Sequence, residues 1–385
     1  MRIAYLCADP GVPVFGRKGA SVHVQAVVAA LANRGAEVHL LAARQGGEPP
    51  GALRDVALHR LPCPRGEPAV RERAALAANA AGSAALEAAG PFDLVYERHA
   101  LWSHAAMEHA RASGTPGLLE VNAPLVDEQA EHRVLVDRDG AERAARRAFA
   151  AASALLAVSQ PVADWLCAHG VPAGRVHVVP NGVDPSRFAP PPPRPRDAPF
   201  TVGFVGTLKP WHGLDALVDA FELLRRQHPG ARLLVVGDGP GRPALEAALV
   251  ARGLSADARI TGAVNPAAVP ALLREMDAAV APYPDLRPFY FSPLKVVEYM
   301  AAGLPVVASR VGQVAQTVEH GVTGLLVPPG DAAATAGALG RLAGDPGLRC
   351  RLGRAARERA AQRYSWDRVA ERILALATRR RAVAA

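Results

Sequence analysis

The chain has 385 residues, of which half are apolar and 21% are charged. That length exceeds what one hydrophobic core usually supports, so a globular protein of two domains is expected. The formal net charge of +8 implies an attraction to acidic partners, but only 5% of the residues are aromatic. Stacking platforms for bases are therefore scarce, and no nucleic-acid partner is expected. Phosphorylated substrates and anionic lipid remain as acidic partners.

We expect neither an export signal nor a membrane-spanning segment. Met1–Asp9 carries one basic residue and lacks an extended apolar region before a cleavage site. The longest apolar stretch, near Phe149–Val158, falls short of the roughly 20 residues that a span requires. We expect a cytoplasmic protein, with peripheral attachment to the inner face of a membrane as an alternative. The cysteines lack the spacing of a zinc site and should be free thiols: Cys7, Cys63, Cys167 and Cys350.

In the first half of the chain, short apolar runs alternate with helical stripes. This alternation predicts a parallel sheet covered by helices. Strands are expected at Ile3–Ala8, Val38–Ala42, Asp93–Glu97, Gly117–Val121, Leu155–Val158 and Val176–Val179. Helices are expected around Val24–Leu31 and at Leu101–Ala112, Ala141–Ala151 and Val162–His169.

The turn cluster Pro180–Asp184 and the proline run Pro190–Pro195 then indicate a domain boundary. The second half repeats the alternation. Its strands are expected at Thr201–Val205, Arg232–Val236, Arg259–Thr261, Ala278–Ala281 and Pro305–Ala308, and its helices at Leu214–Gln227, Ala244–Arg252 and Pro266–Glu275, with a last helix capped by Ser365. Two such α/β halves form a cleft between the carboxyl ends of their sheets, where ligands bind.

The segment Phe291–Gly312 carries the most specific signal. Ser292 is a good N-cap, and Pro293 suits the first helical position because its missing N–H costs nothing there. Three residues at helical spacing are expected to face the core: Leu294, Val297 and Ala301.

Lys295 and Glu298 are three residues apart and lie one turn from each other on this helix. A lysine, a carboxylate and a helix N-terminus together suit a phosphate and a sugar hydroxyl. The alternative is an ordinary surface ion pair, which contributes roughly 0–1 kcal/mol.

This segment resembles the nucleotide-sugar site of the family 4 glycosyltransferases, whose pattern is E-x7-E followed by A-x-G-x-P-V-V-A. The second glutamate corresponds to Glu298, but the first falls at Tyr290. The chain instead resembles a branch that reads F-S-P-x-K-x-x-E-Y-M-A, which makes Lys295 a candidate diphosphate ligand. The turn sequence P-N-G-V-D resembles the interdomain element of the same family, so the resemblance covers nearly the whole chain.

The resemblance implies an α/β protein of the GT-B fold, with two Rossmann-like domains whose parallel sheets face a central cleft. The expected divisions are an acceptor-binding domain at residues 1–185, a proline-rich linker at 186–199, a donor-binding domain at 200–364 and a C-terminal helix at 365–385 that packs back on the first domain.

For the donor, the resemblance implies contacts from several loops. Where the family has G-R and K-G on the first loop of the second domain, this chain has Thr207 and His212, so Lys209 is the candidate for the diphosphate charge. The alternative is a solvent-exposed Lys209 and a His212 that caps the helix. The remaining donor-binding candidates are Gly16, Gly19, Gly206, Gly237, Val264, Ser292, Pro293 and Leu294.

Each glycine loop has a simpler interpretation as a hinge or a tight turn. The first loop is not G-x-G-x-x-G, and the second strand ends in Ala42-Ala43-Arg44 without an acidic residue for a ribose. A dinucleotide-dependent oxidoreductase is therefore disfavoured.

For catalysis and the acceptor, the candidates follow the strand at Gly117–Val121. Asn122 stands where family members often have a histidine, and an amide can bond sugar hydroxyls but cannot transfer protons. Glu120 is a candidate acid or base, with a salt bridge to Arg98 or His99 as the alternative. Arg98 is also a candidate acceptor ligand.

The cluster Asp127, Glu128, Glu131 and His132 falls on one helix and has two interpretations. The resemblance makes Glu128, Glu131 and His132 candidate acceptor ligands. A solvated polar face is the alternative, and no metal site is expected.

The resemblance thus implies a retaining, metal-independent glycosyltransferase of the hexosyltransferase class that uses a nucleotide diphosphate sugar, UDP or GDP first, and no cofactor. The catalytic candidates are Glu298, Lys295, Lys209, Asn122 and Glu120. The acceptor is a hydroxyl of a saccharide, a lipid-linked glycan as in polysaccharide biosynthesis, or a specialised metabolite. The alternatives are a sugar-nucleotide epimerase or hydrolase of the same fold and a non-catalytic subunit.

Overall fold

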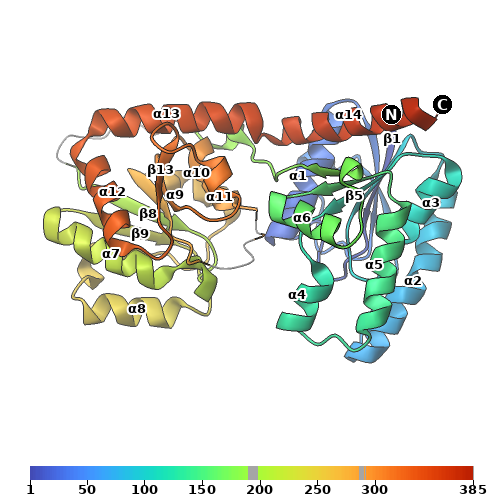
Figure 1. The fold of residues 1–385 in the computed structure, drawn as a ribbon, viewed down its shortest axis with the longest axis horizontal. Helices are drawn as coiled ribbons and strands as arrows, with labels where there is room; N and C mark the ends of the chain where they lie inside the picture. The colour runs from blue at the N-terminus through green and yellow to red at the C-terminus, as the bar shows by residue number, and fades with distance from the viewer. Residues whose placement is uncertain (190–197, 286–289, 291, 385) are drawn as a thin grey trace. The chain divides into compact units, whose positions relative to one another are not determined.

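The computed structural model describes residues 1–189, 198–285, 290 and 292–384 (Figure 1). The chain forms two compact units. Unit 1 consists of Met1–Asn181 and Trp366–Ala385, and unit 2 of Gly182–Ser365. The first boundary lies four residues earlier than the sequence indicates, because Val183 pairs with Ser365 and Phe188 is part of the core of unit 2. The proline run within the expected linker and Phe291 lie outside the described residues.

Unit 1 contains a seven-stranded parallel sheet with the strand order β3-β2-β1-β4-β5-β6-β7. The register places Ile3 beside Val38 on one side and Leu94 on the other. Helices cover both faces, so the strands are nearly continuous apolar runs. The strands are β1 (Arg2–Cys7), β2 (Glu37–Ala42), β3 (Ala57–Arg60), β4 (Leu94–Arg98), β5 (Gly117–Val121), β6 (Ala154–Ala157) and β7 (Val176–Val178).

The helices of unit 1 divide between the two faces of the sheet. On one face, α1 (Gly19–Asn33) and α14 (Trp366–Ala384) pack together over β1 and β4. The other face carries α3 (Ala105–Ser113), which contacts β4 and β5 and lies between α2 (Pro68–Ala89) and α5 (Arg138–Ala151) (Figure 1). The remaining helices are α4 (Leu125–His132), α6 (Gln160–Ala168), η1 (Gly51–Leu53) and η2 (Ala173–Arg175).

Unit 2 contains a six-stranded parallel sheet with the order β10-β9-β8-β11-β12-β13. Its strands are β8 (Thr201–Val205), β9 (Arg232–Val236), β10 (Ala258–Ile260), β11 (Ala278–Ala281), β12 (Val306–Ser309) and β13 (Gly324–Val327). The core on one face is completed by α7 (Leu214–Gln227), α8 (Arg242–Ala251) and α12 (Ala332–Gly344). The other face holds α9 (Val269–Leu273), α10 (Leu294–Ala301), α11 (Val314–Thr317) and α13 (Pro346–Arg363). Short turns form η3 (Pro185–Arg187), η4 (Pro210–His212), η5 (Ser255–Asp257) and η6 (Pro266–Ala268).

The expected α/β class with two Rossmann-like domains is confirmed, while two local predictions were wrong. Pro293, with φ −82° and ψ 62°, is itself the N-cap of α10, so the helix begins one residue later than predicted and Ser292 does not cap it. Leu294 is only half-buried. The buried face of α10 is formed instead by Val296, Val297, Tyr299, Met300 and Ala301.

The helix predicted at Leu101–Ala112 begins at Ala105, after an irregular turn in which Trp102 has φ 78°. The sequence patterns also missed α2, which is alanine-rich and buries only Glu72, Gly82 and Leu86. No helix in the described part of the chain combines the length and the apolar character that crossing a bilayer requires.

Candidate active site

The candidate site lies at the carboxyl end of β8, where α10 is fixed to the strand by a buried tyrosine. The hydroxyl of Tyr299 accepts a hydrogen bond from the N–H of Val205 at 2.7 Å and lies 3.3 Å from its carbonyl oxygen. Tyr299 is fully buried. This contact places the first turn of α10, and with it Lys295, beside the last residue of the strand.

The ammonium of Lys295 is enclosed, and among the described residues it has no anionic group within hydrogen-bond distance. Its Nζ is buried and makes no hydrogen bond within the described structure. The rings of Phe204 and Tyr283 have their centroids 4.3 Å and 5.2 Å from Nζ, which supplies weak cation–π attraction. Burial lowers the pKa of Lys295 to about 7, although nearby Glu298 opposes the shift. The site is therefore electrostatically incomplete, and an anion would complete it.

Two glycines make room around this amine. Gly206 has φ 147°, and a Cβ at this position would lie 3.1 Å from the Nζ of Lys295. Gly237, with φ 141°, is packed so closely that its Cβ would lie 2.1 Å from the carbonyl oxygen of Gly206. Both backbones adopt conformations that favour glycine. The loops after β8 and β9 are therefore in close backbone contact next to Lys295.

Glu298 lies one turn beyond Lys295 and is also unpaired. Among the described residues, its carboxylate has no hydrogen bond or ion pair. Burial raises the pKa of Glu298, and Arg187 and Lys295 only partly oppose this. Arg187 was missed in the sequence because it follows the turn cluster before the second domain, in a segment assigned to the linker. It donates a hydrogen bond to the carbonyl of Pro266 at 3.0 Å.

The loop after β8 brings three further residues to the same strand end. Thr207 is exposed, and its carbonyl oxygen lies 2.5 Å from Nδ1 of His212. Burial lowers the pKa of His212 to about 4, with Lys295 and Lys209 adding to the shift, so the imidazole is neutral at pH 7. Lys209 is half-buried, with Nζ 5.4 Å from the ring centroid of Trp211. A positive charge in this loop therefore comes from Lys209 and not from His212.

The other predicted donor ligands are divided between the units. In unit 2, Val264 is half-buried in the loop after β10, while Ser292, Pro293 and Leu294 lead into α10. In unit 1, a Cβ at Gly16 would lie 2.7 Å from Pro13, whereas Gly19 faces open space. The structure thus brings together Gly206, Thr207, Lys209, Gly237, Lys295 and Glu298 within unit 2.

In unit 1, Glu120 is the centre of a saturated buried network. Its two oxygens contact Nε2 of His23 at 2.8 and 2.9 Å, the hydroxyl of Tyr96 at 2.5 Å and the guanidinium of Arg98 at 2.8 Å. Asn122 also donates to it. Burial alone would raise the pKa of Glu120, but these contacts outweigh it and hold the pKa well below its ordinary value.

This geometry corrects the assignment of Glu120 as an acid or base. A carboxylate with such a low pKa stays ionised and carries no proton to donate, and its oxygens are already occupied. The structural alternative, a salt bridge with Arg98, is what the structure contains. Arg98, a predicted acceptor ligand, is engaged in this salt bridge with Glu120. Asn122 stays half-buried beside the pair.

The predicted acceptor residues Glu128, Glu131 and His132 lie on α4, as the spacing implied. Glu131 and His132 are exposed, and no group of residues suited to a metal ion occurs in the described ranges. Asp127 is engaged structurally, since it pairs with Arg138 at 2.7 Å and accepts from the indole of Trp165. The arrangement agrees with a solvated polar face.

Comparison with known proteins identifies both halves of the chain. Residues 17–187 match the family model described as Glycosyltransferase Family 4, and residues 199–345 match the model described as Glycosyl transferases group 1. A D-inositol 3-phosphate glycosyltransferase from Xylanimonas cellulosilytica is 31% identical over 397 residues, covering 94% of this chain and 93% of the relative. Glycogen synthase of Mycobacterium tuberculosis is 35% identical over 198 residues, covering 51% of this chain and 46% of the relative.

The chain spans about half the length of the first curated relatives that it matches. The solved structures that share its fold include the following two. Sucrose-phosphate synthase from Thermosynechococcus elongatus has a TM-score of 0.74 at 23% identity, with complete coverage of both chains. An Anabaena protein in complex with UDP and glucose has a TM-score of 0.70 at 22% identity, covering 97% of this chain and 98% of that one. With this fold and these relatives, the chain belongs to the family 4 glycosyltransferases of the GT-B fold.

Proposed function

We propose that this protein is a retaining glycosyltransferase that transfers a sugar from a nucleoside diphosphate sugar to a hydroxyl group. Unit 2 binds the donor. Lys295 and Lys209 contact the diphosphate, Glu298 accepts hydrogen bonds from the ribose hydroxyls, and Gly206 and Gly237 let the backbone approach the phosphates.

The observation that carries this proposal is the enclosed, unpaired ammonium of Lys295. A charged group buried without a partner is costly, and the lysine responds by a pKa lowered to about 7. A diphosphate placed against Nζ would restore the charged form and remove that cost. A structural lysine would instead have a carboxylate within reach, as Arg98 has in Glu120.

The chemistry follows from charge. When the bond between the sugar and the diphosphate breaks, the leaving diphosphate gains negative charge, which the two lysines stabilise. The acceptor oxygen attacks on the face that the leaving group departs from, and its proton passes to a phosphate oxygen of that group. This route keeps the anomeric configuration and requires no protein nucleophile. Since the lysines supply the neutralising charge, we propose that transfer does not require a metal ion.

Donor and acceptor are proposed only by class. UDP is the first nucleotide to test, because a protein of this fold has been solved with it. A polar acceptor such as a saccharide, a lipid-linked glycan or a small polyol agrees with the names of the relatives, which include an inositol phosphate glycosyltransferase and a glycogen synthase.

The first experiment measures thermal shift and slow nucleotide release with UDP-, GDP-, dTDP- and ADP-sugars, each with and without EDTA. We expect one donor to stabilise the protein and to be hydrolysed slowly, and EDTA to leave both effects unchanged. Lys295→Ala should reduce the shift, as expected for donor binding weakened by on the order of tenfold or more. Arg274→Ala, at an exposed arginine distant in sequence from the site, should retain the shift. A flat panel with folded protein would contradict donor binding and favour a non-catalytic subunit.

The stereochemistry has its own test. Once an acceptor is found, the anomeric configuration of the product is read by NMR and compared with that of the donor. Retention is expected. An inverted product would require a base in place of the leaving phosphate and would overturn the mechanism while leaving the donor site intact.

A further inference from the structure

One residue of the candidate site, His212, has a partner for only one of its two ring nitrogens. Its Nδ1 lies 2.5 Å from the carbonyl oxygen of Thr207. A carbonyl oxygen can only accept a hydrogen bond, so Nδ1 carries the N–H and Nε2 carries the lone pair of the neutral imidazole. No described residue forms a hydrogen bond with Nε2, and the ring is only half-buried. His212 therefore presents one unengaged hydrogen-bond acceptor.

The orientation of this ring is fixed by its neighbours. The ring centroids of Phe204 and Tyr283 each lie 6.0 Å from that of His212. Gly213, which follows His212, has φ 69°, and a Cβ there would lie 1.7 Å from the carbonyl oxygen of Pro282. The loop can approach the segment after β11 this closely only because glycine occupies the position. Nε2 is thus held in place before any ligand binds, which lowers the cost of binding.

The same two aromatic rings connect His212 with Lys295. Phe204 and Tyr283 are the rings that enclose the Nζ of Lys295. Lys295 and Lys209 are the charged groups that act on the imidazole, and together with burial they keep it neutral at pH 7. An uncharged acceptor therefore lies beside the ammonium that is proposed to contact the diphosphate.

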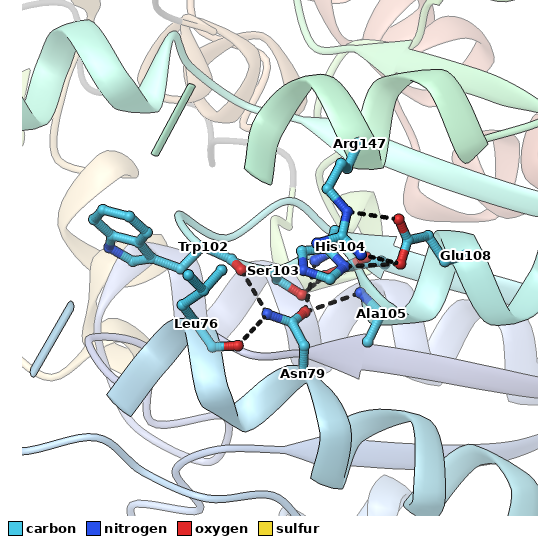
Figure 2. A network of polar contacts seen from close by, with 9 residues as sticks. Leu76, Asn79, Trp102, Ser103, His104, Ala105, Glu108 and Arg147 are labelled. Atoms are coloured by element: carbon cyan, nitrogen blue, oxygen red, sulfur yellow. Dashed lines mark hydrogen bonds and ion pairs between the residues drawn. The ribbon is translucent and has the colours of Figure 1, made fainter. Parts of the chain in front are cut away.

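His104 in unit 1 has the opposite environment. Its Nδ1 contacts the carboxylate of Glu108 at 3.0 Å, and Arg147 pairs with the same carboxylate at 2.8 and 2.9 Å (Figure 2). A carboxylate beside an imidazole favours the protonated form, whereas the lysines beside His212 disfavour it. The protein supplies the partner of His104. The partner of Nε2 in His212 is left to a ligand.

The chemistry of Nε2 selects the part of the donor that it can contact. A diphosphate near pH 7 offers oxygen acceptors and no proton, so it cannot donate to a lone pair. A hydroxyl group can donate, and a nucleoside diphosphate sugar carries hydroxyls on its ribose and on its sugar. The proposed function assigns the ribose to Glu298. The hydroxyls of the transferred sugar therefore remain for His212.

We propose that His212 is a specificity-determining residue, whose Nε2 accepts a hydrogen bond from a hydroxyl of the transferred sugar. This assignment rests on the proposed donor site. The lysine that the family pattern has at this position would serve the diphosphate, so the histidine exchanges a phosphate contact for a sugar contact. A sugar that lacks the hydroxyl leaves the acceptor unsatisfied and should bind more weakly.

The test compares calorimetric titrations of the full chain with the glucose conjugates of UDP, GDP, dTDP and ADP and with the corresponding free diphosphates. An asparagine amide reaches about as far as Nδ1, and a glutamine amide about as far as Nε2. His212→Asn should therefore keep the bond to Thr207 and lose the acceptor, whereas His212→Gln should restore the acceptor. In His212→Asn, we expect about fivefold weaker binding of the glucose conjugate and unchanged binding of the free diphosphate. His212→Gln should recover most of the lost affinity.

Donors that each lack one glucose hydroxyl identify the bond itself. One of these analogues should bind to wild type about fivefold more weakly than the parent conjugate. His212→Asn should bind that analogue and the parent equally, because the two changes remove the same interaction. His228→Asn is the matched control, since His228 lies in the same unit at the opposite end of α7. Thermal melting checks that the variants are folded.

Three results would overturn the proposal. Wild-type affinity of His212→Asn for the glucose conjugate would show that Nε2 makes no bond to the sugar. Equal weakening of the conjugate and the free diphosphate would assign His212 to the nucleotide or to the shape of the loop. If folded wild-type protein binds neither the conjugates nor the free diphosphates, the donor site itself is contradicted, and the role of His212 falls with it.

Discussion

The two units each bury a charged side chain near the end of a central strand, and they treat it in opposite ways. Glu120 in unit 1 is surrounded by His23, Tyr96, Arg98 and Asn122, so its carboxylate is fully satisfied. In unit 2, Lys295 has aromatic rings and glycine around its Nζ, and no anion among the described residues lies within hydrogen-bond distance. In unit 1, the Glu120 carboxylate already has all its partners within the protein. In unit 2, the charge of Lys295 is balanced only when a ligand supplies a negative group.

This contrast teaches which buried charge to assign to function. A saturated network stabilises the fold and shifts the pKa toward the charged form, as at Glu120. For an unsaturated group such as Lys295, burial shifts the pKa in the direction that favours the neutral form. A ligand that supplies the missing charge removes the cost of burial, and this contributes to the affinity. Mutation should therefore affect stability at the first site and ligand affinity at the second.

The largest effect is expected for Glu120→Gln. The change keeps the shape of the side chain but leaves Arg98, whose side chain is only 15% exposed, without its countercharge. Breaking such a buried pair costs about 3–5 kcal/mol of the free energy of unfolding. Urea denaturation measures this directly. Glu298→Gln, at a carboxylate with no described partner, is the control and should change stability far less; similar losses in both would erase the contrast.

Tyr299→Phe is expected to have an intermediate effect. It removes the hydroxyl that bonds the N–H of Val205, so a buried backbone donor is left unsatisfied. The expected loss is about 1–3 kcal/mol of the free energy of unfolding. Because the same contact places Lys295, donor affinity should fall together with thermal stability. A variant with wild-type melting and wild-type affinity would show that the hydroxyl does not position α10.

Lys295→Met should separate binding from stability. Loss of the diphosphate contact should weaken donor binding on the order of tenfold or more, which corresponds to about 1.4 kcal/mol. For Glu298→Ala we expect a fall of the same size in the rate of transfer. The melting temperature of the free protein should be unchanged or higher, since an unpaired buried amine is replaced by an apolar chain. Calorimetric titration measures the affinity for the donor, and differential scanning calorimetry measures the melting temperature of the free protein. A destabilised variant that still binds the donor tightly would make Lys295 a structural residue.

The last prediction concerns pH, whose effect over a few tenths of a unit is the smallest of the four. Lys295 has a pKa of about 7 in the free protein, and a bound diphosphate should raise it. Donor affinity should therefore be greatest below about pH 7 and fall as the pH rises above it, by about tenfold per unit until the pKa of the complex is reached. A nucleoside diphosphate sugar is a clean probe, since its phosphates do not titrate in this range. In Lys295→Met the dependence should vanish; a dependence that persists would have another origin.

The fold could be predicted where apolar runs are continuous and bounded by turns. Gly117–Val121 and Thr201–Val205 coincide with β5 and β8, and Leu214–Gln227 coincides with α7. Helix α2 was missed because alanines give it no large apolar stripe, and the polar side chains that anchor it, Glu72 and Asn79, have their hydrogen-bond partners in other parts of the chain.

The candidate site was predicted only as far as local spacing reaches. The pair Lys295 and Glu298 follows from three-residue separation on a helix. The isolation of the Lys295 amine depends on Phe204, Gly206 and Tyr283, which only the fold brings together. For the same reason the sequence suggested a salt bridge from Glu120 to Arg98 but not its bond to His23, which comes from α1.

The assignment of α14 to unit 1 has a consequence for biosynthesis. The core that β1 and α1 form is completed by α14, through Val369, Ala370, Ile373 and Ala377, so it can close only after α14 has been made. Unit 2 is continuous in the chain and has all its residues before α14 leaves the ribosome. The order of folding should therefore be the reverse of the order of synthesis, with the C-terminal half reaching its native state before the N-terminal half.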